Sequence, residues 1–307
     1  MAHTLTEPDI NRPLTHQIPG INRLAYSPDG QKLATGDIQM NVAVYVGDTL
    51  VFERNLGSEL EKVRPTERIR GLAFSGDGRT LFVAAADTIH AINSETGETV
   101  WAYEPPRSFG FLVISPVALS CQGGLLAASF DNGSVAVWDE AGKLKCLWQD
   151  NDAPRFLAFG FEGTRLIGTD SFSLCAWGST SRSKDVRIPL PNRAFGFAAS
   201  PDGKRVAIRT LQQIVFWDLE SKAVLGSAVA EPGLPVMAFD PTGEVLAVVS
   251  GHRVLQIDSS GAVRREDEME GKEILSLAYR PDGRAIAVGL ADGTAQILPM
   301  GGDSSQL

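Results

Sequence analysis

A four-residue pattern, Ser-Pro-Asp-Gly, recurs along this chain at a nearly constant spacing that restricts the possible folds severely. It is clearest at 27–30 and 200–203, varies slightly at 280–283, and fades at 121–124 and 160–163. The turn glycines are Gly30, Gly78, Gly123, Gly163, Gly203, Gly243 and Gly283. Successive glycines are 48, 45, 40, 40, 40 and 40 residues apart. Repeats of this length are typical of propellers and solenoids.

Short apolar segments surround each turn and predict β-strands. Before the first turn, Leu24 and Tyr26 are two residues apart, as residues on one face of a strand are. Proline presets φ in the turn and glycine accepts a positive φ. A second run follows the turn, as at 32–35, and a third follows that, as at 134–138. A weaker fourth run, such as 143–147, completes the repeat.

The third runs carry a resemblance to the WD40 family. Phe216-Trp217-Asp218 and Val137-Trp138-Asp139 are similar to the closing Trp-Asp of that family. Segments 131–135 and 292–295 are similar to its central turn, and the resemblance covers about residues 21–299. The Gly-His pair that the family places before the first strand is missing from every repeat. This departure suggests a divergent member of bacterial origin whose blades depend on packing more than on that polar network.

Seven first strands predict an all-β, seven-bladed β-propeller of the WD40 type, formed as a single domain over residues 1–307. We expect the blades to start near residues 21, 69, 114, 154, 194, 234 and 274. The last repeat leaves no room for a fourth strand before the end of the sequence. Segment 10–18 is therefore predicted to supply the outer strand of the seventh blade and close the ring, and 300–307 to form a flexible tail.

Composition excludes several classes of partner. The net charge of −9 argues against nucleic acid, because phosphate binding needs a basic surface. No run of 18 apolar residues exists, so no membrane span is expected. The first residues lack the basic and apolar stretches of a secretory signal. Cys121, Cys146 and Cys175 form no close pair and are expected to be small buried residues in a cytoplasmic protein.

The sequence contains few patterns typical of catalytic or metal-binding sites, so we expect neither an enzyme nor a bound cofactor. The four histidines, His3, His16, His90 and His252, are not spaced as metal ligands on one element. Neither a nucleophile elbow nor a glycine-rich phosphate loop occurs. Segment 91–101 resembles the tryptophan-docking motif of quinoprotein propellers but occurs once. It is better interpreted as a tight turn with Trp101 packed between blades. A propeller enzyme, hydrolase-like or quinoprotein-like with its site at the central channel, is the alternative.

The WD40 resemblance implies a protein or peptide partner, bound on the face formed by the loops between blades. Arginine and aromatic residues gather at the starts of blades two to five, and such residues are enriched in binding hot spots. The candidate partner-binding residues are Arg64, Arg68, Arg70, Arg107, Phe109, Phe111, Trp148, Arg155 and Arg193. Acidic residues mark the starts of blades six and seven: Glu231, Asp267, Glu268, Glu270 and Glu273. We therefore expect an acidic ligand over blades two to five, unless these charges are simply solvated.

Two further alternatives remain open at this point. Arg23, Arg70 and Arg155 fall where first-strand residues can point toward the central channel, which would then hold a small anion or only water. The chain could also be a structural subunit of a larger complex. The favoured expectation is a non-enzymatic interaction scaffold.

Overall fold

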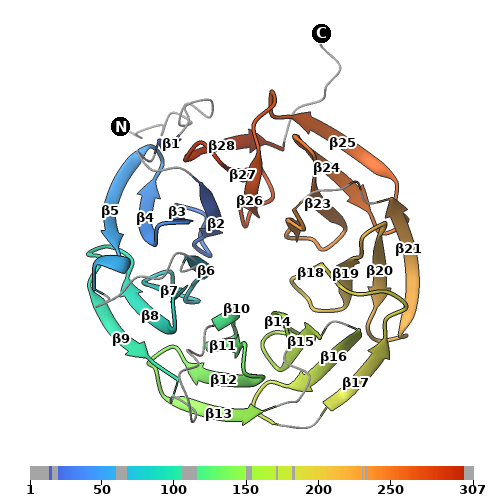
Figure 1. Ribbon diagram of the computed structural model, residues 1–307, viewed down its shortest axis with the longest axis horizontal. Helices are drawn as coiled ribbons and strands as arrows, with labels where there is room; N and C mark the ends of the chain where they lie inside the picture. The colour runs from blue at the N-terminus through green and yellow to red at the C-terminus, as the bar shows by residue number, and fades with distance from the viewer. Residues whose placement is uncertain are drawn as a thin grey trace, which may run out of the picture.

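Seven four-stranded antiparallel sheets form a ring in the computed structural model (Figure 1). The structure describes residues 14–15, 20–59, 68–105, 116–149, 154–170, 172–181, 184–229, 231 and 234–300. Within them, the only helical element is the short 3-10 helix η1 (Gly57–Glu59). The prediction of an all-β, seven-bladed propeller is confirmed.

The first strand of each blade lies innermost and the fourth lies at the rim (Figure 1). The first strands are β2 (Ile21–Tyr26), β6 (Ile69–Phe74), β10 (Pro116–Gln122), β14 (Phe156–Gly160), β18 (Gly196–Ala199), β22 (Met237–Phe239) and β26 (Ile274–Tyr279). The second strands are β3 (Lys32–Asp37), β7 (Thr80–Ala85), β11 (Leu125–Phe130), β15 (Arg165–Thr169), β19 (Arg205–Arg209), β23 (Val245–Ser250) and β27 (Ala285–Leu290). The third strands are β4 (Asn41–Val46), β8 (Thr88–Asn93), β12 (Ser134–Asp139), β16 (Ser173–Gly178), β20 (Gln213–Asp218), β24 (Arg253–Asp258) and β28 (Thr294–Pro299).

The outer strands of the first six blades belong to the same repeat as the strands inside them. They are β5 (Thr49–Asn55), β9 (Thr99–Tyr103), β13 (Leu144–Gln149), β17 (Lys184–Pro189), β21 (Ala223–Val229) and β25 (Val263–Glu268). The seventh blade takes its outer strand from the start of the chain. There β1 (Leu14–Thr15) pairs antiparallel with β28, with Leu14 opposite Ala295 and Thr15 opposite Thr294. The predicted closure of the ring is confirmed.

The hydrophobic core consists of seven clusters, each filling the space between two neighbouring blades. One cluster joins Val42 and Val44 of blade one to Leu81 and Val83 of blade two. The same arrangement continues around the ring, and the last cluster joins blade seven to blade one. The second strands are almost entirely buried, and the third strands are buried or half-buried at most positions, because both face a neighbouring sheet on each side. The ring is therefore one continuous core.

The serine of the repeated turn is a buried hydrogen-bonding centre. Ser27 Oγ donates to Asp29 Oδ1 at 2.5 Å and accepts from the backbone N–H of Lys32 at 2.9 Å. Gly30 follows with a φ of 70°, which explains the glycine. The same bonds recur at Ser75 and Ser200. The motif therefore joins the first strand of a blade to the second by both backbone and side chain.

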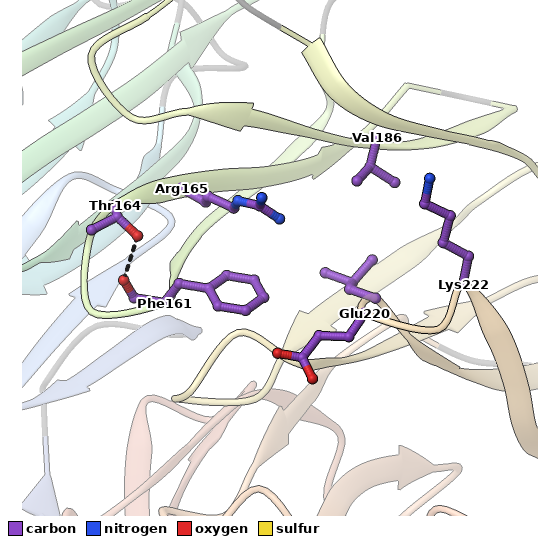
Figure 2. Close-up of a pocket in the computed structure, with 7 residues that line it drawn as sticks. Phe161, Thr164, Arg165, Val186, Glu220 and Lys222 are labelled. Carbon is purple, nitrogen blue, oxygen red and sulfur yellow. Dashed lines mark hydrogen bonds between the residues drawn. The ribbon is translucent and has the colours of Figure 1, made fainter.

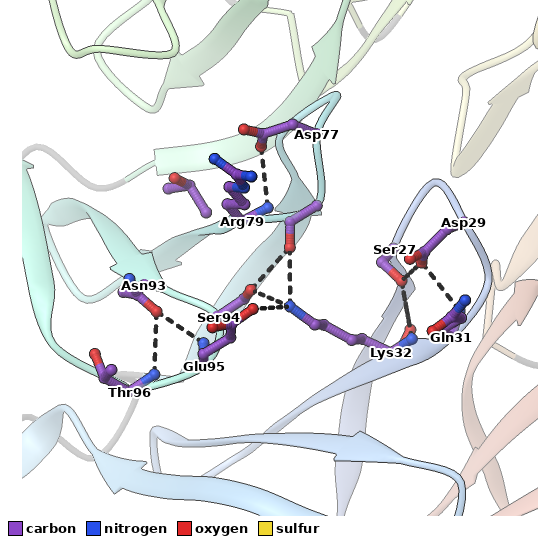
Figure 3. A network of polar contacts seen from close by, with 12 residues as sticks. Ser27, Asp29, Gln31, Lys32, Asp77, Arg79, Asn93, Ser94, Glu95 and Thr96 are labelled. Carbon is purple, nitrogen blue, oxygen red and sulfur yellow. Dashed lines mark hydrogen bonds and ion pairs between the residues drawn. The ribbon is translucent and has the colours of Figure 1, made fainter.

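Basic side chains at the start of some second strands tie one blade to the next. Lys32 Nζ donates to Ser94 Oγ at 2.8 Å and to the carbonyl oxygen of Gly78 at 3.4 Å, both in blade two (Figure 3). Arg205 repeats the contact, because its Nη1 donates to Gly243 O of blade six at 2.8 Å. A charged donor at this position therefore caps the turn glycine of the following blade.

Candidate partner-binding face

The antiparallel order of the strands determines which connections share a face of the ring. The segments that join one blade to the next lie on the same face as the turns between second and third strands, and we call this the loop face. The turns that join first to second strands and third to fourth strands lie opposite, on what we call the turn face. Four of the candidate residues chosen from the sequence, Arg68, Arg70, Arg155 and Arg193, lie on this face, at or just before the first strands of their blades. Partners of propeller scaffolds are expected there because loop side chains are not required to pack the core.

Three arginines gather on this face where blades one and two meet. Arg23 Nε donates to the carbonyl oxygen of Arg70 at 2.7 Å, across the boundary between β2 and β6. Burial and, to a smaller extent, the charges of Arg68 and Arg70 together lower the pKa of Arg23 to about 10. Arg70 is the extra residue of a β-bulge between Ile69 and Gly71. Such bulges re-aim a side chain, and this one adds Arg70 to the group of positive charges.

Two more candidate arginines lie on blades four and five. Arg155 is exposed just before β14, where its backbone N–H donates to Thr169 O at 2.8 Å. Arg193 is exposed on the segment between β17 and β18, and its guanidinium carbon lies 5.5 Å from the centre of the Phe195 ring. This cation–π distance holds the arginine over an aromatic face. The structure brings Arg193 and Phe195 together, whereas Arg155 starts a separate blade.

The remaining candidates divide into undescribed and buried residues. Arg64, Arg107, Phe109 and Phe111 lie outside the described residues. Trp148 is only 5% exposed and packs in the core between blades three and four with Val135 and Leu157. Its indole therefore supports the core, which corrects its assignment to the partner-binding surface. The physical reason is register: Trp148 lies opposite Val135, a buried position of β12.

A group of exposed apolar side chains on blades four to six was missed from the sequence. We call this group the apolar patch: Phe172, Phe195, Leu211 and Leu234. Phe172 is 60% exposed and Leu211 is 73% exposed. Apolar side chains that are exposed on neighbouring loops of one face are candidates for an interaction site. The available signal was apolar residues in turns between strands, such as Phe172 after Asp170 and Leu211 after Thr210.

Backbone hydrogen bonds connect the segments that carry the apolar patch. Leu190 N–H donates to Phe172 O at 2.7 Å, and Phe195 N–H donates to Arg209 O at 2.7 Å. The buried Arg209 guanidinium in turn donates to Leu234 O at 2.9 Å and to Val249 O at 3.2 Å. Arg209 is 4% exposed, and burial lowers its pKa. The loop that presents Leu234 is therefore fixed to blade five, whose strand β19 carries this buried cation.

The acidic sector predicted for blades six and seven is partly neutralised. Both carboxylate oxygens of Glu231 accept from Arg253, at 2.9 and 3.0 Å, and one also accepts from Ser250 Oγ. These contacts, the Ser250 bond first, lower the pKa of Glu231. Asp267 pairs with Arg265 at 2.7 Å. Glu268, Glu270 and Glu273 are exposed, so the loop face keeps its negative charge mainly on blade six's outer strand and before blade seven.

Two structural features are absent from the described part of the chain. No group of three or more His, Cys, Asp or Glu residues there is arranged to hold a metal ion. No helix in those residues is long and apolar enough to span a membrane. Trp101, the residue of the quinoprotein-like motif, packs between blades with its ring 5.8 Å from Phe82 and 6.4 Å from Trp138.

Comparison with known proteins supports the WD40 resemblance. A sequence model of the WD40 domain of anaphase-promoting complex subunit 4 matches residues 234–302. Periodic tryptophan protein 2 of Arabidopsis thaliana is 27% identical over 290 residues, which are 91% of this chain and 28% of that protein. Topless-related protein 4 of the same plant is 25% identical over 295 residues, 89% of this chain and 25% of that protein.

A shorter match involves WD repeat-containing protein SL1-17 of Schistosoma mansoni. It is 26% identical over 176 residues, which are 56% of this chain and 46% of that protein. The chain thus spans between about a quarter and a half of the length of these relatives. None of these organisms is a bacterium, so the matches do not support the bacterial origin that the missing Gly-His pairs suggested.

Proposed function

We propose that the chain is a non-enzymatic protein-interaction platform whose loop face binds a protein or peptide with acidic and apolar side chains. The observation that carries this proposal is the pair formed by Arg193 and Phe195 within the apolar patch. An arginine held over an exposed aromatic ring offers a carboxylate-binding group and an apolar surface at one place. Arginine and aromatic residues are the side chains that dominate binding energy at interfaces.

The position of the other arginines extends this surface around the ring. Arg155 is exposed at the start of blade four, and Arg68 is exposed at the start of blade two. Guanidinium groups bind carboxylates with two parallel hydrogen bonds, which gives strength and direction. A partner lying over blades two to five would meet these arginines and the blade-four and blade-five part of the apolar patch.

The relatives support the general class of function. The matching family model describes a WD40 domain of a complex subunit, and one relative is named as a WD repeat-containing protein. A rigid scaffold with adaptable loops fits such a role. We place the activity in the cytoplasm, where cysteines such as the free Cys121, Cys146 and Cys175 remain reduced.

The test is a comparison of charge-matched variants. The protein with Arg68, Arg155 and Arg193 changed to Gln is purified from the source cells at low salt, beside the wild type. A control variant carries Gln at Arg79, Lys143 and Arg284, three exposed cations of the turn face. We expect a stoichiometric partner with the wild type and the control, and its loss with the loop-face variant. Equal recovery of the partner by all three proteins would contradict the proposal.

A further inference from the structure

The arginine that joins blades one and two has no carboxylate partner in the part of the chain that the structure describes. Arg23 lies on β2, one of the innermost strands of the ring (Figure 1). Its Nε donates to Arg70 O at 2.7 Å and its Nη1 donates to Asn22 O at 2.6 Å, so both bonds go to backbone carbonyl groups. Nη2 donates to none of the described residues. This half-buried cation therefore lacks the counter-charge that ions removed from water need.

The surroundings of Arg23 add positive charge. The charges of Arg68 and Arg70 both act to lower the pKa of Arg23, as like charges close to a cation do. With a pKa of about 10, Arg23 still carries its proton at pH 7. The buried carboxylate of Asp37 in the same blade is already occupied, because its two oxygens accept from the backbone N–H and from Nδ2 of Asn41 at 2.9 and 2.6 Å. The charge of Arg23 therefore stays uncompensated among the described residues.

The Arg23 guanidinium is also held in a fixed position between the two blades. Its Nε bond reaches from β2 to Arg70 O on β6, and the preceding residue repeats the contact, since Asn22 Nδ2 donates to Ile69 O at 3.0 Å. Asn22 and Arg70 are the extra residues of β-bulges in β2 and β6. The two bonds therefore join the bulged starts of neighbouring strands. A donor that is already fixed loses little conformational entropy when it binds an anion.

A doubly charged oxyanion matches this arrangement better than a single carboxylate does. The Nη2 group of Arg23 offers N–H donors, and guanidinium groups bind phosphate oxygens through charge-assisted hydrogen bonds. The charges of Arg68 and Arg70 act at the same place, so each negative charge of a ligand is attracted by more than one cation. A phosphoryl group carries a charge of about −1.5 to −2 at pH 7, whereas a carboxylate carries a single charge. The arrangement therefore favours phosphate.

We propose that Arg23 and Arg68 form a phosphate-binding site on the loop face, at the boundary between blades one and two. The ligand is free phosphate or a phosphate group on a partner, since both present the same oxygens. A free ion would join the first two blades. A phosphate group on a partner would extend the proposed partner surface, on which this second case rests. Phosphate itself needs no partner, so the isolated protein tests the site independently of partner recovery.

Titrations of the isolated protein separate phosphate from a carboxylate. Sodium phosphate and sodium acetate are compared at pH 7.5 and constant ionic strength, by calorimetry and by amide chemical shifts. We expect phosphate to bind at least about tenfold more tightly than acetate, with the shifts centred on 21–23 and 68–70. Absence of phosphate binding, or equal binding of the two anions, would overturn the proposal.

A pair of peptides identifies the source of the phosphate. A hexapeptide with one phosphoserine is compared with the same hexapeptide carrying glutamate at that position. A phosphopeptide that binds more tightly than free phosphate would show that the phosphate is carried by a chain, and one that binds no more tightly would show that the ligand is the free ion. A glutamate peptide that binds as tightly as free phosphate would contradict the preference for phosphate and overturn the proposal.

Variants assign the binding to the two arginines. Arg23→Gln should weaken phosphate binding at least about tenfold, and Arg68→Gln at least about threefold, because each removes a charged donor. Arg68 is exposed, so its variant keeps the test valid even if the loss of Arg23 disturbs the fold. Unchanged affinity in the Arg68 variant would contradict the assigned site.

A pocket on the opposite face provides the control for anions that bind elsewhere. It lies on the turn face between blades four and five, has a volume of about 470 Å³, and includes the exposed cation Lys222 in its lining (Figure 2). Lys222→Gln should leave the phosphate affinity unchanged, as should Arg79→Gln, which removes an exposed arginine of the turn face. An effect of either control as large as that of Arg68→Gln would assign the binding to general surface charge and overturn the proposal.

Discussion

At the scale of single residues, the serine contributes more hydrogen bonds to the repeated turn than the sequence pattern alone indicates. The proline and glycine of Ser-Pro-Asp-Gly could be interpreted from their φ preferences, and Gly30 has the positive φ expected of it. The role of Ser27 could not be predicted, because it depends on which side chain the strand pairing buries. Its hydroxyl donates a hydrogen bond to Asp29 and accepts one from the backbone N–H of Lys32 at the start of β3. Its bond is the main reason that the pKa of Asp29 is lowered.

Replacing this hydroxyl should destabilise the protein. Ser27→Ala removes a nearly fully buried hydroxyl and leaves the Lys32 N–H without its side-chain acceptor, which costs about 1–3 kcal/mol. Gln31→Ala, in the same turn with an exposed side chain, is the control and should change stability by less than about 0.5 kcal/mol. Urea unfolding of the two variants measures both effects. Equal midpoints would show that the serine is dispensable.

Acid should weaken the protein through carboxylates at the ends of third strands. Asp258 accepts from Ser260 Oγ, from the N–H of Ala262 and from Arg264, and these bonds, the Ser260 bond first, lower its pKa from 3.8 to about 2. A lowered folded-state pKa stabilises the fold above pH about 4, and that stabilisation is lost as the pH falls toward 2. The urea midpoint of Asp258→Asn should thus lie below that of the wild type at pH 6. The gap should narrow at pH 2.5, and a gap independent of pH would contradict this origin.

At the scale of elements, neighbouring blades are joined by apolar clusters and by a few polar contacts near the axis and on the turn face. Ser276 Oγ of blade seven donates to Ile21 O of blade one at 2.9 Å, and Asn22 Nδ2 donates to Ile69 O of blade two at 3.0 Å. Lys32 adds the tie shown in Figure 3. These contacts link one blade to the next. They are long-range in sequence, so a single repeat cannot show them.

Removing one such tie should loosen the boundary between blades one and two. Lys32→Met keeps the apolar stem but loses the bonds to Ser94 and Gly78, which we expect to cost about 1–2 kcal/mol because the ammonium is mostly buried. Glu95→Gln is the control: its carboxylate is largely exposed at 3.5 Å from Lys32 and should matter little. Thermal unfolding compares the two. An equal shift of the unfolding temperature in both variants would show that the effect comes from the ion pair between Lys32 and Glu95 instead.

The number and order of elements could be predicted from spacing and strand counting. Seven co-spaced turns predicted seven blades, and segment 10–18 was predicted to supply the outer strand of the seventh blade, where β1 pairs with β28. The bulge that inserts Arg70 into β6 could not be predicted, because a bulge is a property of strand register. The burial of Trp148 likewise follows from its pairing with Val135.

At the scale of the whole molecule, the ring separates two surfaces with different chemistry. The loop face carries arginines of blades one, two, four and five and the apolar patch, and the turn face carries a pocket between blades four and five. The sequence identified the loop face and its arginines but not the apolar patch. Which apolar turn residues stay exposed depends on how neighbouring loops cover them, and repeat patterns carry no information about that.

The most direct test of the account asks which face meets the partner in cells. A photo-crosslinking amino acid is placed at Leu211, in the apolar patch, and separately at Lys143, on the turn face, where both side chains are exposed. We expect irradiation to crosslink a partner protein at position 211 and none at position 143. The crosslinked product at position 211 should disappear when Arg68, Arg155 and Arg193 are changed to Gln. A product at position 143 with none at position 211 would place the binding surface on the opposite face and contradict the account.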